Sequence, residues 1–258
     1  MAKNRVSAAV EIFEEPGAWS EANLMSDCTT MSDASILNRE MYSEPEAARL
    51  VRVAPSTLHY WLEGGSQRGK VYRPIIRSEP RGDRSVTWAE FVEAALLREC
   101  RREHKVPMAE LRQFIDGLRG RLGVPYPLAD KRPYTSARQL VEDAQEEAGL
   151  DAPFCLVAVA GQQRILTPAS QSFLDRVTWD GDTAVGWRPH DDSESPVLVS
   201  PTLRFGRPAV KGVSTEVIWE HSVLGDEGVG EIAEAFGIDA EDVRWALAYE
   251  TSVHAAAA

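Results

Sequence analysis

The sequence predicts a mainly helical α+β protein made of three folded modules. Helix-capping signals followed by apolar residues at helical spacing recur towards both ends of the chain. Short β-prone runs bounded by turn residues occupy the stretches between them. The chain has 258 residues, more than one small hydrophobic core needs. We therefore expect an N-terminal winged helix-turn-helix, a small central α+β region and a C-terminal three-helix module.

Charge is divided unevenly along the chain, and this supports the division into modules. The whole chain has a formal net charge of −12, yet residues 36–134 hold 18 basic and 13 acidic side chains. The remainder carries the opposite balance, −17. A basic module predicts an acidic partner such as DNA, and an acidic remainder predicts a basic protein partner. The predicted organisation is a poorly ordered arm over 1–35, the winged helix-turn-helix over 36–134, the central region over 135–200 and the helical module over 201–258.

Two short helices with a tight turn between them form the expected helix-turn-helix. Ser43 and Glu46 make a capping box for the first helix. Pro55 suits the first turn of the second helix, which Gly64 ends. If this second helix enters the major groove, Leu58 and Trp61 face the core, and the residues expected near the bases are Ser56, Thr57, His59 and Tyr60. The alternative is that the two helices serve only in packing.

A β-wing is expected over residues 64–86, with β-prone pieces at 70–73 and 75–77. This segment contains six basic and two acidic side chains. A wing beside a recognition helix lies where the DNA phosphates are, so the basic side chains are expected to contact them. The expected phosphate contacts are Arg68, Lys70, Arg73 and Arg77.

The remaining elements follow from caps and turn residues. Thr87 and Glu90 form a second capping box for a helix to about Arg102, and a further helix runs from Pro107 to Gly123. The central region is expected to hold a helix over 136–148, a buried strand over 154–160 with a partner over 163–166, a helix over 168–177, a hairpin around Asp180-Gly181 and a strand over 197–200. The C-terminal helices are expected over 216–224, 227–236 and 240–250.

Several function classes find no support in the sequence. Cys28, Cys100 and Cys155 have neither metal-site nor redox spacing, and the five histidines are too far apart to form a helical metal pair. No phosphate-binding loop or nucleophile motif is present. The longest apolar stretch, Phe154–Ala160, is too short to span a membrane. We expect a cytoplasmic protein with no catalytic residues, cofactor, metal or membrane contact.

Residues Tyr42–Leu50 and Pro55–Trp61 together resemble the helix-turn-helix of MerR-type regulators, whose second helix opens with the pattern Ser-x-Thr-Leu-x-Tyr. The resemblance continues in the same order through Val71–Arg73, Val86–Phe91 and Val106–Arg112, and covers residues 42–121. It implies DNA binding and transcription regulation. The chain departs from the pattern at His59, where arginine is usual, and at Ala54, where a serine cap is usual. It also lacks the metal-binding cysteines and the long dimerisation helix of the metal-sensing members.

Residues Phe205–Gly212, followed by Glu231–Gly237 and Glu241–Leu247, are similar to the small helical domain found in antitoxins of VapBC-type toxin–antitoxin pairs. This similarity covers residues 202–250, with Gly212-Val213-Ser214 where Gly-Thr-Arg is common. The combination of both resemblances implies a VapB-type antitoxin. Such a protein binds operator DNA as the repressor of its own operon and neutralises a toxin that is typically a PIN-domain ribonuclease. A homodimer or a larger hetero-oligomer with the toxin is implied.

The C-terminal module carries more large apolar side chains than three short helices can easily bury. We expect the toxin to bind there, through Ile218, Trp219, Phe236, Trp245 and Tyr249. One alternative is that these side chains pack against the central region or a second copy of the chain. Two other functions stay open: a MerR-like transcriptional regulator without a toxin partner, which senses a ligand through the central region, and an enzyme built on that region.

Overall fold

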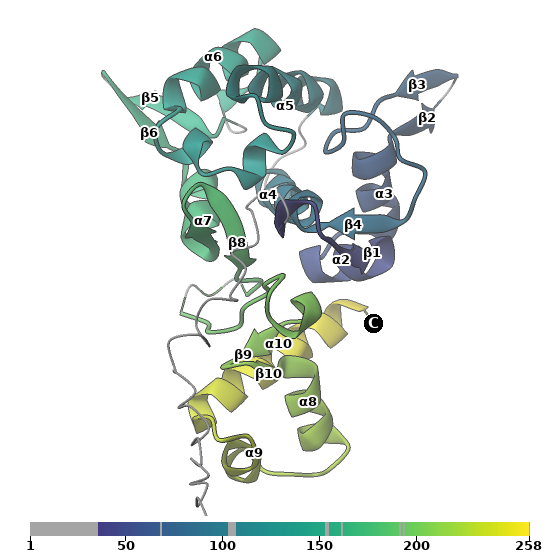
Figure 1. Cartoon of the computed structure of the whole chain (residues 1–258), viewed down its shortest axis with the longest axis vertical. Helices are drawn as coiled ribbons and strands as arrows, with labels where there is room; N and C mark the ends of the chain where they lie inside the picture. The colour runs from purple at the N-terminus through teal and green to yellow at the C-terminus, as the bar shows by residue number, and fades with distance from the viewer. Residues whose placement is uncertain are drawn as a thin grey trace, which may run out of the picture. The chain divides into compact units, whose positions relative to one another are not determined.

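The computed structural model describes residues 36–67, 69–102, 107–152, 155–160, 162–190, 192 and 194–257, all within one compact unit of the chain. The predicted arm over 1–35 and the predicted phosphate contact Arg68 lie outside the described residues. The fold mixes α and β structure, with helices predominating and small strand pairs between them, as the sequence predicts (Figure 1). Among the described helices, none is long and apolar enough to cross a membrane.

Helices α2 (Glu44–Val51) and α3 (Pro55–Glu63) begin where their caps predict, and α3 also ends at the predicted glycine. Strand β1 (Glu40–Ser43) pairs antiparallel with β4 (Ser85–Thr87) and leads directly into α2. The Ser43 hydroxyl accepts a hydrogen bond from the Glu46 amide at 3.4 Å, which confirms the predicted cap. Helix α3 ends at Gly64, whose φ is 73°. A Cβ there would lie 2.2 Å from the Tyr72 carbonyl oxygen, so only glycine fits this turn.

One part of the expected wing is a hairpin and the other is not. Strands β2 (Gly65–Gln67) and β3 (Lys70–Tyr72) pair antiparallel and project beyond α3 (Figure 1). The prediction of a strand over 75–77 is wrong. The amides of Ile75 and Ile76 donate to the Trp61 carbonyl at 2.9 and 3.0 Å, and both side chains are buried. The segment therefore turns into the core, where α3 satisfies its backbone in place of a neighbouring strand.

Two long helices follow the hairpin. Helix α4 (Trp88–Arg102) begins with the predicted capping box. The Glu90 amide donates to the Thr87 hydroxyl at 3.3 Å, and the Thr87 amide donates to the Glu90 carboxylate at 2.9 Å. Helix α5 (Met108–Leu122) ends at the left-handed Gly123, also as predicted. It packs against α6 (Arg138–Ala148), which lies beside it in Figure 1.

The central elements are close to expectation, with two corrections. Strands β5 (Val157–Ala160) and β6 (Gln163–Leu166) pair, α7 (Pro168–Arg176) follows, and β7 (Val177–Asp180) and β8 (Thr183–Trp187) form the predicted hairpin. Strand β5, expected to be buried, is buried only at its first residue, Val157, and Val159 is 56% exposed in this two-stranded sheet. Residues 198–200 make isolated bridges instead of the expected regular strand.

One apolar cluster runs from Tyr42 to Val199. It joins Trp61 and Trp88 of the first helices to Phe173 and Trp187 of the central region. Residues on both sides of the predicted limit at 134/135 therefore share one core. The domain limits themselves stay predictions.

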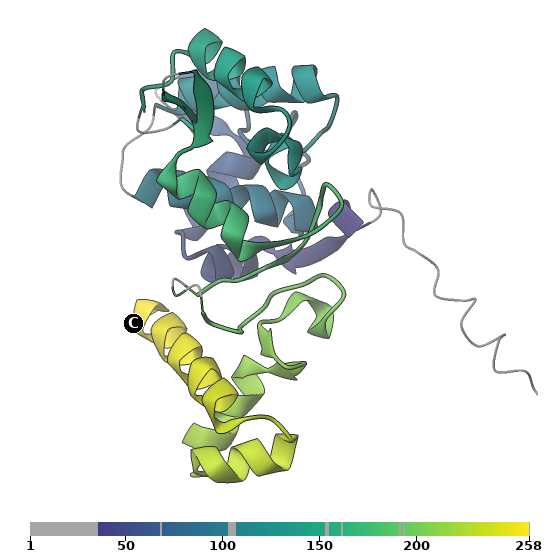
Figure 2. The same ribbon diagram turned by 90° about the vertical axis from the view of Figure 1, so that its left-hand side faces the viewer.

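The last helices enclose a second, smaller apolar cluster. Strands β9 (Ala209–Val210) and β10 (Val213–Ser214) pair before α8 (Thr215–Val223), α9 (Val229–Phe236) and α10 (Ala240–Ala257), which pack on one another (Figure 2). Helix α8 begins at Thr215, with Ser214 at the N-cap position and no side-chain capping bond, and α10 continues well past the predicted end at Glu250. Two hydrogen bonds of 2.7 Å join this part to β1 and to the end of α2, from the Tyr42 hydroxyl to the Gly206 carbonyl and from Arg52 to the Ser252 hydroxyl.

Candidate nucleic-acid interface

Helix α3 has one face in the core and one face turned outward. Leu58, Trp61 and Leu62 are at most 2% exposed and anchor the helix. Ser56 and His59 are exposed, and Thr57 and Tyr60 are half-buried. The predicted separation of faces is confirmed. Contact of the outer face with bases stays a prediction.

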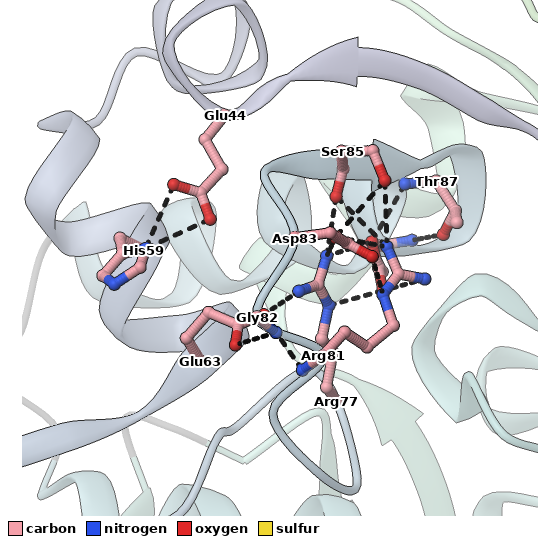
Figure 3. A network of polar contacts seen from close by, with 10 residues as sticks. Glu44, His59, Glu63, Arg77, Arg81, Gly82, Asp83, Ser85 and Thr87 are labelled. Atoms are coloured by element: carbon pink, nitrogen blue, oxygen red, sulfur yellow. Dashed lines mark hydrogen bonds and ion pairs between the residues drawn. The ribbon is translucent and has the colours of Figure 1, made fainter.

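His59 is held by a carboxylate from the neighbouring helix. Its Nδ1 lies 3.1 and 3.0 Å from the two carboxylate oxygens of Glu44 (Figure 3). Glu44 is buried and stands in the first turn of α2, where the helix dipole favours a negative charge. The imidazole is half exposed, so Glu44 fixes its orientation without covering it.

Tyr60 is held by an arginine that the sequence pattern does not single out. The Arg112 guanidinium donates to the Tyr60 hydroxyl at 2.7 Å and to the Arg73 carbonyl at 2.6 Å. It also lies 5.3 Å from the Tyr60 ring centre and 5.7 Å from that of Tyr72. Arg112 therefore links α5 to both α3 and the hairpin. The Tyr60 hydroxyl accepts this bond and keeps its own hydrogen for donation.

The hairpin presents two of the predicted phosphate contacts. Lys70 and Arg73 are both exposed. Arg73 has an acidic neighbour, Glu79, at 4.0 Å, and Lys70 lies 5.5 Å from the Tyr72 ring centre. An exposed ion pair of that length contributes little, so it would not hold Arg73 back from a phosphate. Val71 stands between these two cations and is 78% exposed.

Arg77 is not on this surface, and its prediction as a phosphate contact is wrong. Its side chain is 3% exposed and pairs with Glu63, with Glu90 at 2.8 Å and with Asp83 at 3.6 Å (Figure 3). It also donates to the Ser85 carbonyl at 2.7 Å. Burial by itself lowers the pKa of Arg77, but the hydrogen bond to Glu90 and the surrounding carboxylates raise it overall. Charge counting along the sequence could not separate this buried cation from the exposed ones.

Two adjoining hollows lie alongside α3. One, of about 380 Å³, is lined by three arginines, Arg52, Arg98 and Arg101. The other, of about 530 Å³, reaches the base of the hairpin at Gly65. Thr57, Trp61 and Arg101 border both. Among the described residues that line the two hollows, none is a carboxylate.

The residues predicted to bind a protein partner fall into two groups. Ile218 and Tyr249 are at most 1% exposed and belong to the core of the last helices, so their prediction as surface anchors is wrong. Trp219, Phe236 and Trp245 are half-buried and pack against histidine rings, at 4.2, 5.0 and 5.4 Å between centres. These five residues do not form one exposed patch.

The most exposed apolar side chains of the last helices lie elsewhere. Val223 is 54% exposed and Leu224 is 78% exposed, at the end of α8. Glu220 and Asp226 are exposed on either side of them in the sequence. Spacing alone does not single out this pair, because the sequence does not say where α8 leaves the core. As for metals, no cluster of potential ligands occurs among the residues that the structure describes.

Comparison with known proteins finds similarity to a curated protein and to a solved structure. The chain is 32% identical over 226 residues to a protein of Mycobacterium tuberculosis (strain ATCC 25618 / H37Rv) named "Uncharacterized protein Rv2308", and the alignment covers 85% of this chain and 93% of that protein. The crystal structure of Rv2018 from Mycobacterium tuberculosis superposes with a TM-score of 0.66 at 22% identity, covering 82% of this chain and 99% of that one. At this identity the likeness concerns the fold alone. No protein-family model matches.

Proposed function

This chain belongs to the family of the Mycobacterium tuberculosis protein Rv2308, and we propose that it is the antitoxin of a type II toxin–antitoxin pair. In this proposal it represses its own operon by binding operator DNA and neutralises a cognate ribonuclease toxin of the VapC type, with a PIN domain. It acts in the cytoplasm, as a homodimer or within a larger assembly with the toxin. Inhibition is stoichiometric, so the chain itself needs no catalytic group.

The outer face of α3 is the observation that carries the DNA-binding part of the proposal. Ser56 and His59 are exposed on a helix that three buried side chains anchor. Two glutamate–histidine contacts and the Arg112 bond to Tyr60 restrict the polar side chains before any ligand binds. Restricted side chains lose less conformational entropy on binding. We propose that α2, α3 and the β2–β3 hairpin act as a winged helix-turn-helix of the MerR type, with α3 in the major groove.

The phosphate contacts in this proposal come from three side chains. Lys70 and Arg73 stand on the exposed hairpin, and Arg112 lies between the hairpin and α3. Phosphate contacts fix the position of a protein on DNA and contribute most of its salt-dependent affinity. Arg77 is left out of this set, because three carboxylates already surround it.

The toxin-binding part of the proposal is assigned to α8–α10, as an antitoxin-type helical domain. Residues 201–258 carry 4 basic and 10 acidic side chains. A ribonuclease must present positive charge to RNA, so an acidic surface would attract it and compete with its substrate. Affinity also needs apolar anchors. We propose Val223 and Leu224 as those anchors, in place of Ile218 and Tyr249.

The toxin-binding proposal is tested by adding the purified chain to the nuclease encoded by the adjacent gene and measuring RNA cleavage. Equimolar wild-type chain is expected to suppress cleavage. The double variant Val223→Ser/Leu224→Ser is expected to require at least tenfold more protein, because two anchors of about 1 kcal/mol each are removed. Val71→Ser, which removes an equally exposed apolar side chain from the hairpin, is the control.

The outcomes separate this function from its alternatives. If the wild-type chain binds DNA but never affects the nuclease, the chain is a MerR-like regulator without a toxin partner. If it suppresses the nuclease and the serine variant does so equally well, the toxin binds another surface. Loss of suppression in Val71→Ser alone would move the toxin site to the hairpin.

A further inference from the structure

The hollow between α3 and α4 is lined by three arginines and by Trp61, and two of these residues, Arg52 and Trp61, each have a buried nitrogen that lacks an acceptor among the described residues. Arg52 comes from the end of α2, and Arg98 and Arg101 come from the second half of α4. Thr57 lines both this hollow and the second one. Three arginines from two elements line the hollow, and no acidic residue is among its described lining residues, although Arg98 already pairs with Glu99 outside the lining.

The donors in question are two buried nitrogens. Within the part of the chain that the structure describes, neither Arg52 Nε nor Trp61 Nε1 has a hydrogen-bond acceptor. The Trp61 side chain is only 2% exposed, and Arg101 lies 5.9 Å from its ring centre. Buried donors are nearly always bonded, so each such exception calls for an acceptor. An anion with several oxygens would supply acceptors and negative charge together.

The three arginines differ in how far other groups already satisfy them. Arg98 donates to Glu99 at 2.7 Å, and Arg52 donates to Ser252 at 2.7 Å. The guanidinium of Arg101 lies against the Trp61 ring and within 3.8 Å of the Met108 sulfur, both weak partners. Burial lowers the pKa of Arg101. Of the three, Arg101 therefore has the most to gain from an anion.

We propose that this hollow, bordered by Arg52, Thr57, Trp61, Arg98 and Arg101, is a binding site for a phosphate group. Arg101 turns off the indole ring towards the phosphate, and the Trp61 Nε1–H and the Thr57 hydroxyl then donate to its oxygens. The phosphate belongs either to the backbone of a DNA duplex or to a small phosphate in solution. Only the first source rests on the proposed operator binding.

The test follows the indole N–H signals of the ¹⁵N-labelled full-length chain by NMR. The Trp61 signal is assigned by its absence in Trp61→Phe. Inorganic phosphate is titrated against sodium chloride of equal ionic strength, and in a second arm a duplex taken from upstream of the gene is titrated. The Trp61 signal is expected to shift in a saturable manner in at least one arm. A shift with inorganic phosphate but not with the duplex identifies a small anion as the ligand. A shift with the duplex identifies a phosphate of the DNA backbone.

Arg101→Gln keeps a polar side chain of similar length and removes the charge. In whichever titration shifts the Trp61 signal, this variant is expected to bind the ligand about tenfold more weakly, which is the typical effect of losing one hydrogen bond to a charged group. For DNA, the slope of log affinity against log salt should also fall by about 0.9. The control is Arg121→Gln, on α5, where the arginine pairs with Glu147 of α6. This variant should bind phosphate and the duplex as the wild type does.

The proposal is overturned if the Trp61 signal moves in neither arm, or if Arg101→Gln and Arg121→Gln behave alike. If Trp61→Phe does not fold, the salt slope and phosphate affinity of Arg101→Gln decide the question alone. Failure of operator binding looks different: the wild-type chain then binds no duplex, whatever happens with inorganic phosphate.

Discussion

The imidazole Nδ1 of His59 lies 3.0 Å from the Glu44 carboxylate, so the start of α2 sets the orientation of a side chain on the outer face of α3. Glu44 is buried and His59 is half exposed. A buried acid that holds an exposed base in place is an arrangement suited to presenting a ring to a ligand. Because Glu44 does not itself reach the surface, its effect on DNA would be indirect.

Replacing Glu44 by Gln tests this relationship. The amide has nearly the same shape but removes the charge, so His59 should lose about 1 kcal/mol of hydrogen bonding and become less ordered. We expect affinity for the operator to fall several-fold, with affinity for a random duplex unchanged, as measured by fluorescence anisotropy. Glu40→Gln, the same charge change at an exposed position on β1, is the control. If the two variants bind the operator equally well, Glu44 does not orient His59 for DNA binding.

Lys70 and Arg73 should contribute affinity without specificity. Their replacement by Ala is expected to weaken operator and random DNA alike. The slope of log affinity against log salt should fall by about 0.9 for each phosphate that the variant no longer binds. The measurement is a salt titration of both duplexes. Lys131→Ala/Arg121→Ala removes the same charge away from the hairpin, and a matching slope in the two double variants would rule out the hairpin as a phosphate-binding element.

Arg77 should matter for stability and not for DNA. Arg77→Met removes the buried cation that pairs with Glu63 and Glu90, and leaves Glu90 only the partly exposed Arg81, at 3.4 Å. Breaking a buried ion pair in this way typically costs about 3–5 kcal/mol. Urea unfolding should show a loss of that order, whereas Arg73→Met at the exposed hairpin should change little. A stable Arg77→Met that has lost DNA affinity would contradict the structural role.

Local sequence rules predict the parts of the fold that near neighbours in the chain determine, and fail where tertiary contacts decide. The caps of α2 and α4 are predictable because Ser43 and Thr87 act on amides three residues away. The strand predicted at Ile75 and Ile76 is wrong, since their backbone partner is the Trp61 carbonyl, supplied by tertiary packing. The same limit applies to the site. The exposure of Ser56 and His59 follows from helical spacing. The burial of Arg77 and the contact of Arg112 with Tyr60 depend on partners 13 and 52 residues away in the chain.

Glu93 should make stability depend on pH. It is fully buried, and burial raises its pKa from 4.5 to about 8, with one oxygen bonded to the Leu128 amide at 2.9 Å. The folded state therefore holds a proton that the unfolded chain releases. Its stabilising effect is complete below about pH 4.5 and is lost as the pH rises towards 8.

The expected slope is a fall in the free energy of unfolding of roughly 1.4 kcal/mol for each pH unit within that window, from this one group. Glu93→Gln cannot ionise and should flatten the curve, most visibly between pH 6 and about 8 by urea unfolding. Glu40→Gln at the surface should keep the wild-type slope. A Glu93→Gln curve parallel to the wild type would show that this carboxyl does not titrate in the window.

The central claim is that α3 reads DNA, and the most direct test compares a duplex from upstream of the gene with a scrambled duplex of equal composition. By anisotropy at fixed salt, the wild-type chain should prefer the upstream duplex by about 10³-fold or more. His59→Ala/Tyr60→Phe keeps the Tyr60 ring against Arg112 and should lose about 1–3 kcal/mol of that preference for each good contact, without losing affinity for the scrambled duplex. Equal binding of both duplexes by the wild-type chain, or an unchanged preference in the folded double variant, would contradict the account.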